Sequence, residues 1–223
     1  MGTSPGSHIH IFDLEGSLMY VQNKTIIVVC EGASEKAYIQ ELNRYIEEQD
    51  IPLHFIPRPS NGGQYAHVIR KFREERKNNN TYRILVWVDL DRYKRNDRSD
   101  MDNYRKKSND IPDFHFTHMN FEDFLSMHRD RSEMERWWTL CVSRGHFTTP
   151  SHSSEYMPAF TTFIGGRYSK GDMPIAIDCH SLNNLRIHQN DASVPFKCDF
   201  AAELFGLIDA EEFNETSTRD TCY

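Results

Sequence analysis

The chain has 223 residues, of which 38% are hydrophobic and 26% charged, as expected for one sizeable globular domain or a domain with an appended half. Its formal net charge of −7 argues against a protein that covers nucleic acid with its whole surface. No apolar segment approaches the roughly 20 residues that span a bilayer, and no charged start precedes an apolar stretch, so we expect neither a membrane anchor nor a signal peptide. Five cysteines without paired spacing argue against a disulfide framework, and we expect a cytoplasmic protein.

The predicted elements begin after a leader over residues 1–22. The run KTIIVVC (Lys24–Cys30) is β-branched and lacks polar alternation, which is typical of a strand covered on both faces. Apolar residues at helical spacing predict helices over Ser34–Glu48 and Tyr65–Lys77. Further apolar runs predict strands over Leu53–Ile56, Arg83–Val88 and Phe114–His118, followed by a helix over Phe121–Met127.

Strands and helices alternate along residues 23–130, and this pattern predicts an α/β fold with a mainly parallel sheet flanked by helices. We interpret these residues as the domain that carries the function. Residues 131–223 are expected to form a C-terminal helical or irregular extension packed on that core, with helices over Met134–Val142 and Asp199–Ile208.

Acidic residues follow two of the buried strands. Glu31 ends the first strand, where Gly32 is expected to let the backbone turn sharply, and Asp89 and Asp91 follow the third strand. Because the carboxyl ends of parallel strands meet at one edge of a sheet, we expect these acids to converge in one crevice. Glu35, at the start of the first helix, lies close enough in the chain to join them.

Carboxylates that crowd together repel one another unless a cation lies among them. Oxygen ligands suit Mg²⁺ or Mn²⁺, which can bind a phosphate oxygen, activate water and stabilise a leaving oxygen. The pattern therefore favours phosphodiester hydrolysis or phosphoryl transfer. The expected metal ligands are Glu31, Asp89, Asp91 and, as a ligand for a second cation, Glu122. The alternative interpretation of an acid after a strand is a helix cap or a loop residue, and that of Glu122 is an ordinary first-turn glutamate favoured by the helix dipole.

These motifs resemble a known family. VVCEGASE (residues 28–35) followed by VWVDLD (residues 86–91) resembles the Toprim domain, which topoisomerases, bacterial primases and several nucleases share. The resemblance implies a Rossmann-like fold, with Glu31 as a general acid/base or metal ligand and Asp89 and Asp91 as Mg²⁺ ligands. Nuclease branches of the family also use an acid at the place of Glu35.

A narrower likeness covers about residues 24–205. CEGASEKAYIQEL (residues 30–42) is similar to the opening of RloB-like proteins, C-E-G-x-x-T-E-x-x-Y, although Ala33-Ser34 precedes the second glutamate here in place of the usual threonine. The resemblance implies a nuclease that accompanies bacterial restriction and abortive-infection systems, with defence proteins among its partners.

Two later segments extend the likeness. NFEDFLSMH (residues 120–128) resembles the N-P-x-F-E-x-W-x-x-x-H segment of RloB-like proteins without its proline and tryptophan, and it carries over Phe121, Glu122 and His128. RYSKGD (residues 167–172) resembles a Tyr-x-Lys element through Tyr168 and Lys170.

His128 and Lys170 are therefore further catalytic candidates. His128 could donate a proton to a leaving oxygen or contact phosphate, and its alternative is a partly buried helix residue. Lys170 would neutralise charge in the transition state, and its alternative is an ordinary turn residue.

Residues 92–107 form a local basic patch in a chain of negative net charge, because they hold seven Lys/Arg against three Asp. This patch is a candidate for binding nucleic acid, and the alternative interpretation is a solvated loop. Tyr93 and Tyr104 within it are candidates for stacking on unpaired bases. The candidates for binding the phosphate backbone, which position nucleic acid without reading its sequence, are Arg58, Arg70, Lys94 and Arg95.

The sequence thus predicts a Mg²⁺- or Mn²⁺-dependent Toprim nuclease that acts on DNA or RNA. One alternative is a phosphatase, because DLDRY loosely resembles the D-x-D-x-T/V loop of haloacid-dehalogenase enzymes. The other is a non-catalytic Toprim-like sensor or docking subunit of a defence complex. The choice between DNA and RNA, the activation trigger and a homo-oligomeric state are left open by the sequence.

Overall fold

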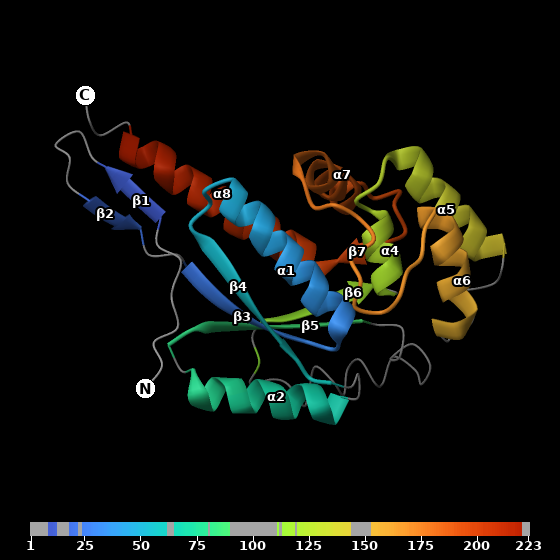
Figure 1. The fold of residues 1–223 in the computed structure, drawn as a ribbon, viewed down its shortest axis with the longest axis horizontal. Coiled ribbons are helices and arrows are strands. Elements are labelled where there is room, and N and C mark those ends of the chain that lie inside the picture. Colours follow the sequence, from blue (N-terminus) through green and yellow to red (C-terminus); the bar gives the residue numbers. More distant parts are fainter. Residues whose placement is uncertain are drawn as a thin grey trace.

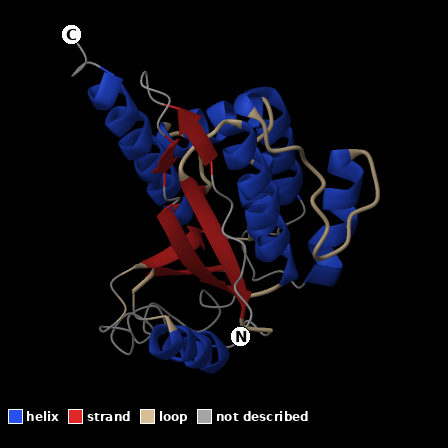
Figure 2. Ribbon diagram, turned by 60° about the vertical axis from the view of Figure 1, so that its left-hand side comes forward, coloured by secondary structure: helices blue, strands red, loops and turns tan. Residues whose placement is uncertain are grey.

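The computed structural model describes residues 9–12, 18–21, 24–61, 65–79, 81–89, 111, 113–118, 120–143 and 153–219. Its main body is a five-stranded sheet in the order β4-β3-β5-β6-β7 with helices on both faces (Figures 1 and 2). The strands from β3 to β6 are parallel, and β7 pairs antiparallel with β6. The prediction of an α/β fold with a mainly parallel sheet is therefore confirmed. The strands are β3 (Lys24–Cys30), β4 (Leu53–Pro59), β5 (Arg83–Asp89), β6 (Phe114–His118) and β7 (Lys197–Cys198).

The helices cover the two faces of the sheet unequally. One face is covered by α2, and α1 and α8 lie on the other (Figure 1). The helices are α1 (Ala33–Glu48), α2 (Tyr65–Asn78), α4 (Phe121–Ser126), α5 (Arg131–Ser143), α6 (Ser153–Ile164), α7 (Cys179–Asn190) and α8 (Asp199–Arg219). No helix in these described ranges combines the length and apolar character needed to cross a membrane.

The lack of polar alternation in β3 follows from this layering. Successive side chains of a strand point to opposite faces, so Val28 joins the core beneath α1 while Val29 joins the core above α2. All residues from Ile26 to Cys30 are fully buried. The central position of β3 therefore explains why its sequence is apolar at every step.

The edge strand β4 is longer than its sequence suggested. The predicted strand ended at Ile56 because prolines follow, whereas the pairing with β3 continues to Pro59. Proline lacks a backbone donor, but an edge strand has one side without a neighbour, so its prolines break no hydrogen bond on that side.

Both ends of the chain contain structure that the sequence analysis did not predict. The expected leader includes an antiparallel hairpin of β1 (Ile9–Phe12) and β2 (Leu18–Val21). In the expected extension, β7 joins the main sheet, α6 and α7 precede it, and α8 runs on to Arg219. The strand β7 could not be recognised by length or periodicity, because it has only two residues.

A stacked aromatic pair fixes α8 to the centre of the sheet. Phe200 lies parallel to Trp87 of β5, with ring centroids 4.3 Å apart and an interplanar angle of 11°. Both side chains are fully buried, and the Trp87 indole N–H donates to Thr117 Oγ1 at 2.9 Å. The beginning of α8 is therefore part of the core that supports β5.

We predict that Phe200→Ala lowers the free energy of unfolding by about 3–5 kcal/mol, because it removes a buried ring and leaves a cavity against Trp87. Denaturant unfolding of the purified protein measures the change. The control Ile187→Ala, at a residue that is 54% exposed on α7, should stay within about 0.5 kcal/mol of wild type. A loss at Phe200 no larger than at Ile187 would contradict the packing described.

Candidate active site at the carboxyl edge of the sheet

The order of the strands creates a switch point between β3 and β5. From β3 the chain passes through α1 to β4 on one side, and then returns through α2 to β5 on the other side. Ligands of open α/β sheets bind outside the carboxyl ends of the strands at such a point. In the register Cys30 lies opposite Trp87, so Glu31, which follows β3, and Asp89, the last residue of β5, lie at this edge on adjacent strands. The structure therefore places both acids at the same edge of the sheet, and their convergence in one crevice stays a prediction.

Asp89 is held by the helix after the next strand. One carboxylate oxygen, Oδ2, accepts a hydrogen bond from the backbone N–H of Phe121 at 3.0 Å. The carboxylate thus lies at the N-terminus of α4, whose exposed N–H groups favour negative charge. The other oxygen, Oδ1, is buried, as is Oε1 of Glu31. Asp91 lies outside the described residues.

Glu35 lies in the first turn of α1 and is buried, with 6% of its surface exposed. Its Oε2 accepts a hydrogen bond from the backbone N–H of Gly32 at 3.1 Å. Gly32 itself has φ −152°, and a Cβ there would approach Glu35 Oε2 only to 3.6 Å. The sharp turn that we expected glycine to permit is therefore not the reason for Gly32, because neither the backbone nor the surrounding space requires glycine at this position.

Glu122 lies in the first turn of α4 and is also buried, with 2% exposed. Its Oε1 accepts a hydrogen bond from the Tyr168 hydroxyl at 3.0 Å, and the Tyr156 hydroxyl is a further partner. Tyr156 was missed in the sequence, because it lies on α6 in a stretch whose spacing indicates nothing about its partner.

The electrostatics of Glu35 and Glu122 connect these residues with Lys170. Burial raises the pKa of Glu35, and the negative charge of Glu122 raises it further. Burial likewise raises the pKa of Glu122. The ammonium group of Lys170 acts in the opposite sense on the pKa of both carboxyls. The predicted site residues Glu35, Glu122 and Lys170 are therefore close enough to influence one another.

The segment RYSKGD places Lys170 beside the two carboxyls. Tyr168 is buried against the core, and the Gly171 N–H donates to Ser34 Oγ at 3.2 Å. Gly171 has φ +97°, and a Cβ there would lie 3.1 Å from the Ala33 Cβ. Glycine is therefore required for this close approach to α1. The segment is a turn, as its sequence suggested, and it fits closely over the first turns of α1 and α4.

The donor chemistry of these residues suits Mg²⁺ or Mn²⁺, because carboxylate oxygens are the ligands that these ions prefer. A cation would also offset the burial that raises the pKa of Glu35 and Glu122. Within the described ranges, no group of three or more His, Cys, Asp or Glu side chains is arranged to hold an ion. Three of the predicted ligands, Glu31, Asp89 and Glu122, are described residues and do not form such a group, so the ligand set that they make with Asp91 stays a prediction.

His128 forms a different kind of contact from the one expected of a proton donor. It is 2% exposed, and its Nδ1 must donate to the Phe124 carbonyl at 3.2 Å, since a carbonyl only accepts. Its Nε2 then accepts from the Tyr38 hydroxyl at 3.1 Å. Both ring nitrogens are therefore used inside the core, and we assign His128 to packing in place of catalysis.

The predicted nucleic-acid contacts are spread over two elements. Arg70 is exposed on α2. Arg58, on β4, donates to Glu75 of α2 at 3.4 Å. Lys94 and Arg95, together with Tyr93 and Tyr104, lie outside the described residues.

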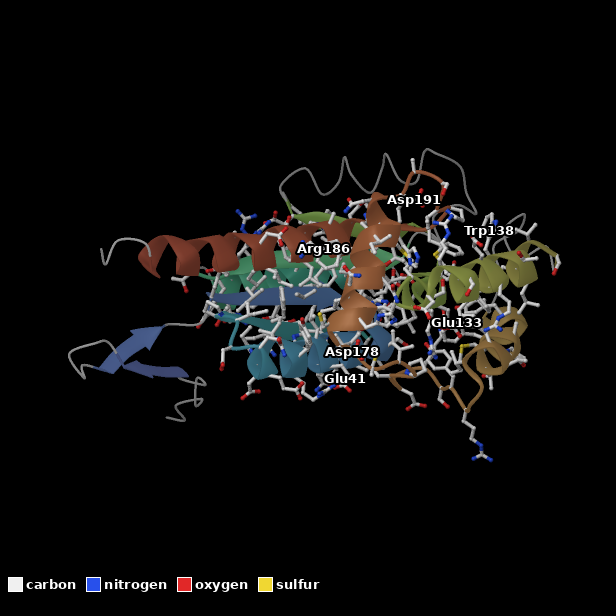
Figure 3. The ribbon with its side chains drawn as sticks, turned by 90° about the horizontal axis from the view of Figure 1, so that it is seen from above. Glu41, Glu133, Trp138, Asp178, Arg186 and Asp191 are labelled. Atoms are coloured by element: carbon white, nitrogen blue, oxygen red, sulfur yellow. The ribbon has the colours of Figure 1, made fainter. Side chains whose placement is uncertain are left out.

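A hollow of about 210 Å³ lies away from these acids, where the N-termini of α5 and α7 approach each other. Its lining includes Glu133 and Asp178, both labelled in Figure 3, and the Asp130–His180 pair with an N···O distance of 3.0 Å. Asp178 is used as the N-cap of α7, where it accepts from the Ser181 N–H. These contacts are structural, and no sequence motif pointed to them.

Comparison of the chain with protein-family models, curated proteins and solved structures found no match. The resemblance to Toprim and RloB-like proteins therefore stays a prediction from the motifs.

The contacts of His128 predict a stability change with pH. Burial lowers the pKa of His128 to about 4, whereas an unfolded histidine titrates near pH 6.5. The unfolded state therefore binds more protons between these values, so the stabilisation is complete above about pH 6.5 and is lost as pH falls toward 4. The shift corresponds to about 3 kcal/mol.

The variant His128→Gln removes this titration, so its free energy of unfolding should vary less between pH 7 and pH 4 than that of wild type. Denaturant unfolding at a series of pH values measures both. His180→Gln is the matched control for the loss of an imidazole from the surface, because the His180 side chain is 73% exposed. Identical pH slopes in wild type and His128→Gln would refute the assignment.

Proposed function

We propose that this protein is a divalent-metal-dependent nuclease of the Toprim type, which hydrolyses phosphodiester bonds in nucleic acid. The observation that carries the proposal is the position of Glu31 and Asp89 after adjacent parallel strands at the switch point. The first turns of α1 and α4 add Glu35 and Glu122 at the same edge. Carboxylate oxygens are the ligands that a hard cation prefers, and we infer that these side chains converge on one when it binds.

Glu31, Asp89 and Asp91 would hold the ion, with Glu122 available for a second one. A bound Mg²⁺ or Mn²⁺ supplies Lewis-acid polarisation of the phosphate and a water of lowered pKa. The contact of Asp89 with the Phe121 N–H fixes its carboxylate between β5 and α4. Preorganised ligands of this kind need no rearrangement when substrate arrives.

Glu35 and Glu122 are suited to proton transfer, because burial raises the pKa of both carboxyls toward the range in which they can take up and return a proton. The Tyr168 hydroxyl orients Glu122. Lys170 is exposed beside them and offers positive charge to a phosphate that approaches from solvent.

The RloB-like motifs support bacterial antiviral defence as the setting of this activity. On that basis the partners would be DNA or RNA and proteins of a defence system. This part of the proposal depends on the motifs VVCEGASE and NFEDFLSMH and on no contact in the structure.

We predict that Glu31→Gln and Asp89→Asn each lower Mg²⁺-dependent cleavage by more than about 100-fold. Mutation of a residue that only supports a metal ligand typically lowers metal affinity or activity by about 10–100-fold, so a larger loss indicates a ligand. Both changes keep the size of the side chain and remove its charge. Gel analysis of DNA and RNA incubated with Mg²⁺, Mn²⁺ or chelator measures cleavage. Glu41→Gln, at a position on α1 that pairs with Arg44, is the control and should cleave like wild type.

Several results would overturn the proposal. Full activity of both variants would remove Glu31 and Asp89 from the site. Cleavage of phosphate monoesters in place of nucleic acid would favour a phosphatase. Binding of Mn²⁺ by calorimetry without cleavage of any nucleic acid would favour a non-catalytic sensor or docking subunit.

A further inference from the structure

The charges of the described helices are divided between the two faces of the sheet. The helix α2 carries five Lys/Arg against two Glu, and it covers its face without another described helix beside it (Figure 1). On the opposite face, α8 carries six Asp/Glu against one Arg. A protein with a net charge of −7 thus presents one helix with an excess of positive charge.

Three of the cations on α2 form a stripe that points away from the sheet. Arg70, Arg73 and Lys77 are exposed, and their spacing of three and four residues places them on one side of the helix. The opposite side of α2, with Val68 and Phe72, is buried against the sheet. The stripe is therefore a consequence of how α2 packs.

The stripe lacks the ion pairs that are common elsewhere on the surface. Arg44 lies between Glu41 and Glu48 on α1, which is the usual pattern of a solvated helix face. By contrast, no carboxylate in the described ranges pairs with Arg70, Arg73 or Lys77. The two glutamates of α2 are engaged by other cations, namely Lys71 and Arg58. Cations at such spacing repel one another by a few tenths of a kcal/mol per pair, and Glu74, four residues after Arg70 and three before Lys77, is the one acid of α2 on this side of the helix.

The direction of α2 connects the stripe with the candidate active site. β4 is parallel to β3, so α2 begins after the same edge at which Glu31 lies and then runs back along the sheet. Seven residues of helix separate Arg70 from Lys77, which is about 10 Å along the axis. One strand of a duplex carries a phosphate for about every 3.4 Å of duplex axis, so a stripe of this length is long enough to reach more than one phosphate.

We propose that the face of α2 formed by Arg70, Arg73 and Lys77 binds the phosphodiester backbone of nucleic acid and directs one strand to the carboxyl edge of the sheet. This inference rests on the proposed function and deepens it by assigning the substrate to the α2 face. The recognised chemistry is the backbone that DNA and RNA share, so the stripe positions the substrate without selecting its sequence.

The test removes the three charges together in the variant Arg70→Ala/Arg73→Ala/Lys77→Ala. Fluorescence anisotropy with labelled single-stranded DNA, duplex DNA and RNA, all in chelator, measures binding without cleavage. We expect affinity to fall by at least about 10-fold, and the slope of log K against log salt to decrease in magnitude by about 2 to 3. The nucleic acid with the largest loss identifies the substrate class.

The matched control removes three exposed cations from other elements, Lys24, Arg44 and Arg136, by alanine substitution. It should keep the wild-type affinity and salt slope. An α2 variant that binds like wild type would overturn the stripe but leave the proposed nuclease intact, because cleavage is tested separately at Glu31 and Asp89. Equal losses in the control, or wild-type protein that binds heparin but neither DNA nor RNA, would also overturn it.

Discussion

Parallel pairing of β3 with β4 on one side and with β5 on the other is the constraint from which the remaining features follow. Parallel neighbours require a helical crossover on each return, and these crossovers are right-handed. Because one crossover leads to β4 and the next leads back across β3 to β5, α1 and α2 must cover opposite faces. The same pairing leaves the carboxyl ends of β3 and β5 side by side without a connection across them. A charged residue at the tip of a fully buried strand would be costly in most places, but at this edge Glu31 lies where the covering helices begin.

The candidate site is assembled from elements far apart in the chain, and small structural features hold it together. Asp89 reaches the α4 N-terminus through the Phe121 N–H, and Glu122 follows one residue later. The segment with Tyr168 and Gly171 then covers these first turns, and the positive φ of Gly171 permits its approach to α1. Buried carboxyls with raised pKa are tolerated because hydroxyl groups and a nearby lysine offset part of the cost.

The sequence predicted those parts of the structure that depend on local pattern. Patterns such as the apolar run of β3 and the helical spacing of α1 predicted the sheet and its crossovers. They therefore also predicted the edge of the sheet at which Glu31 and Asp89 lie. Features that depend on tertiary contacts were not accessible. The two residues of β7 join the sheet only because Thr117 and His118 offer a free edge, and the contact of Tyr156 with Glu122 joins α6 to α4. His128 matched a motif, yet its Nε2 accepts a hydrogen bond from the hydroxyl of Tyr38, which lies 90 residues earlier in the chain.

The stacking of Phe200 on Trp87 has a consequence for biosynthesis. A ribosome delivers the strand that ends in Asp89 long before it delivers Phe200, Tyr168 or Gly171, so the emerging polypeptide exposes Trp87 without its cover. The segment that covers the first turns of α1 and α4 is thus synthesised well after β3 and β5, so the acids at the ends of these strands emerge before their cover.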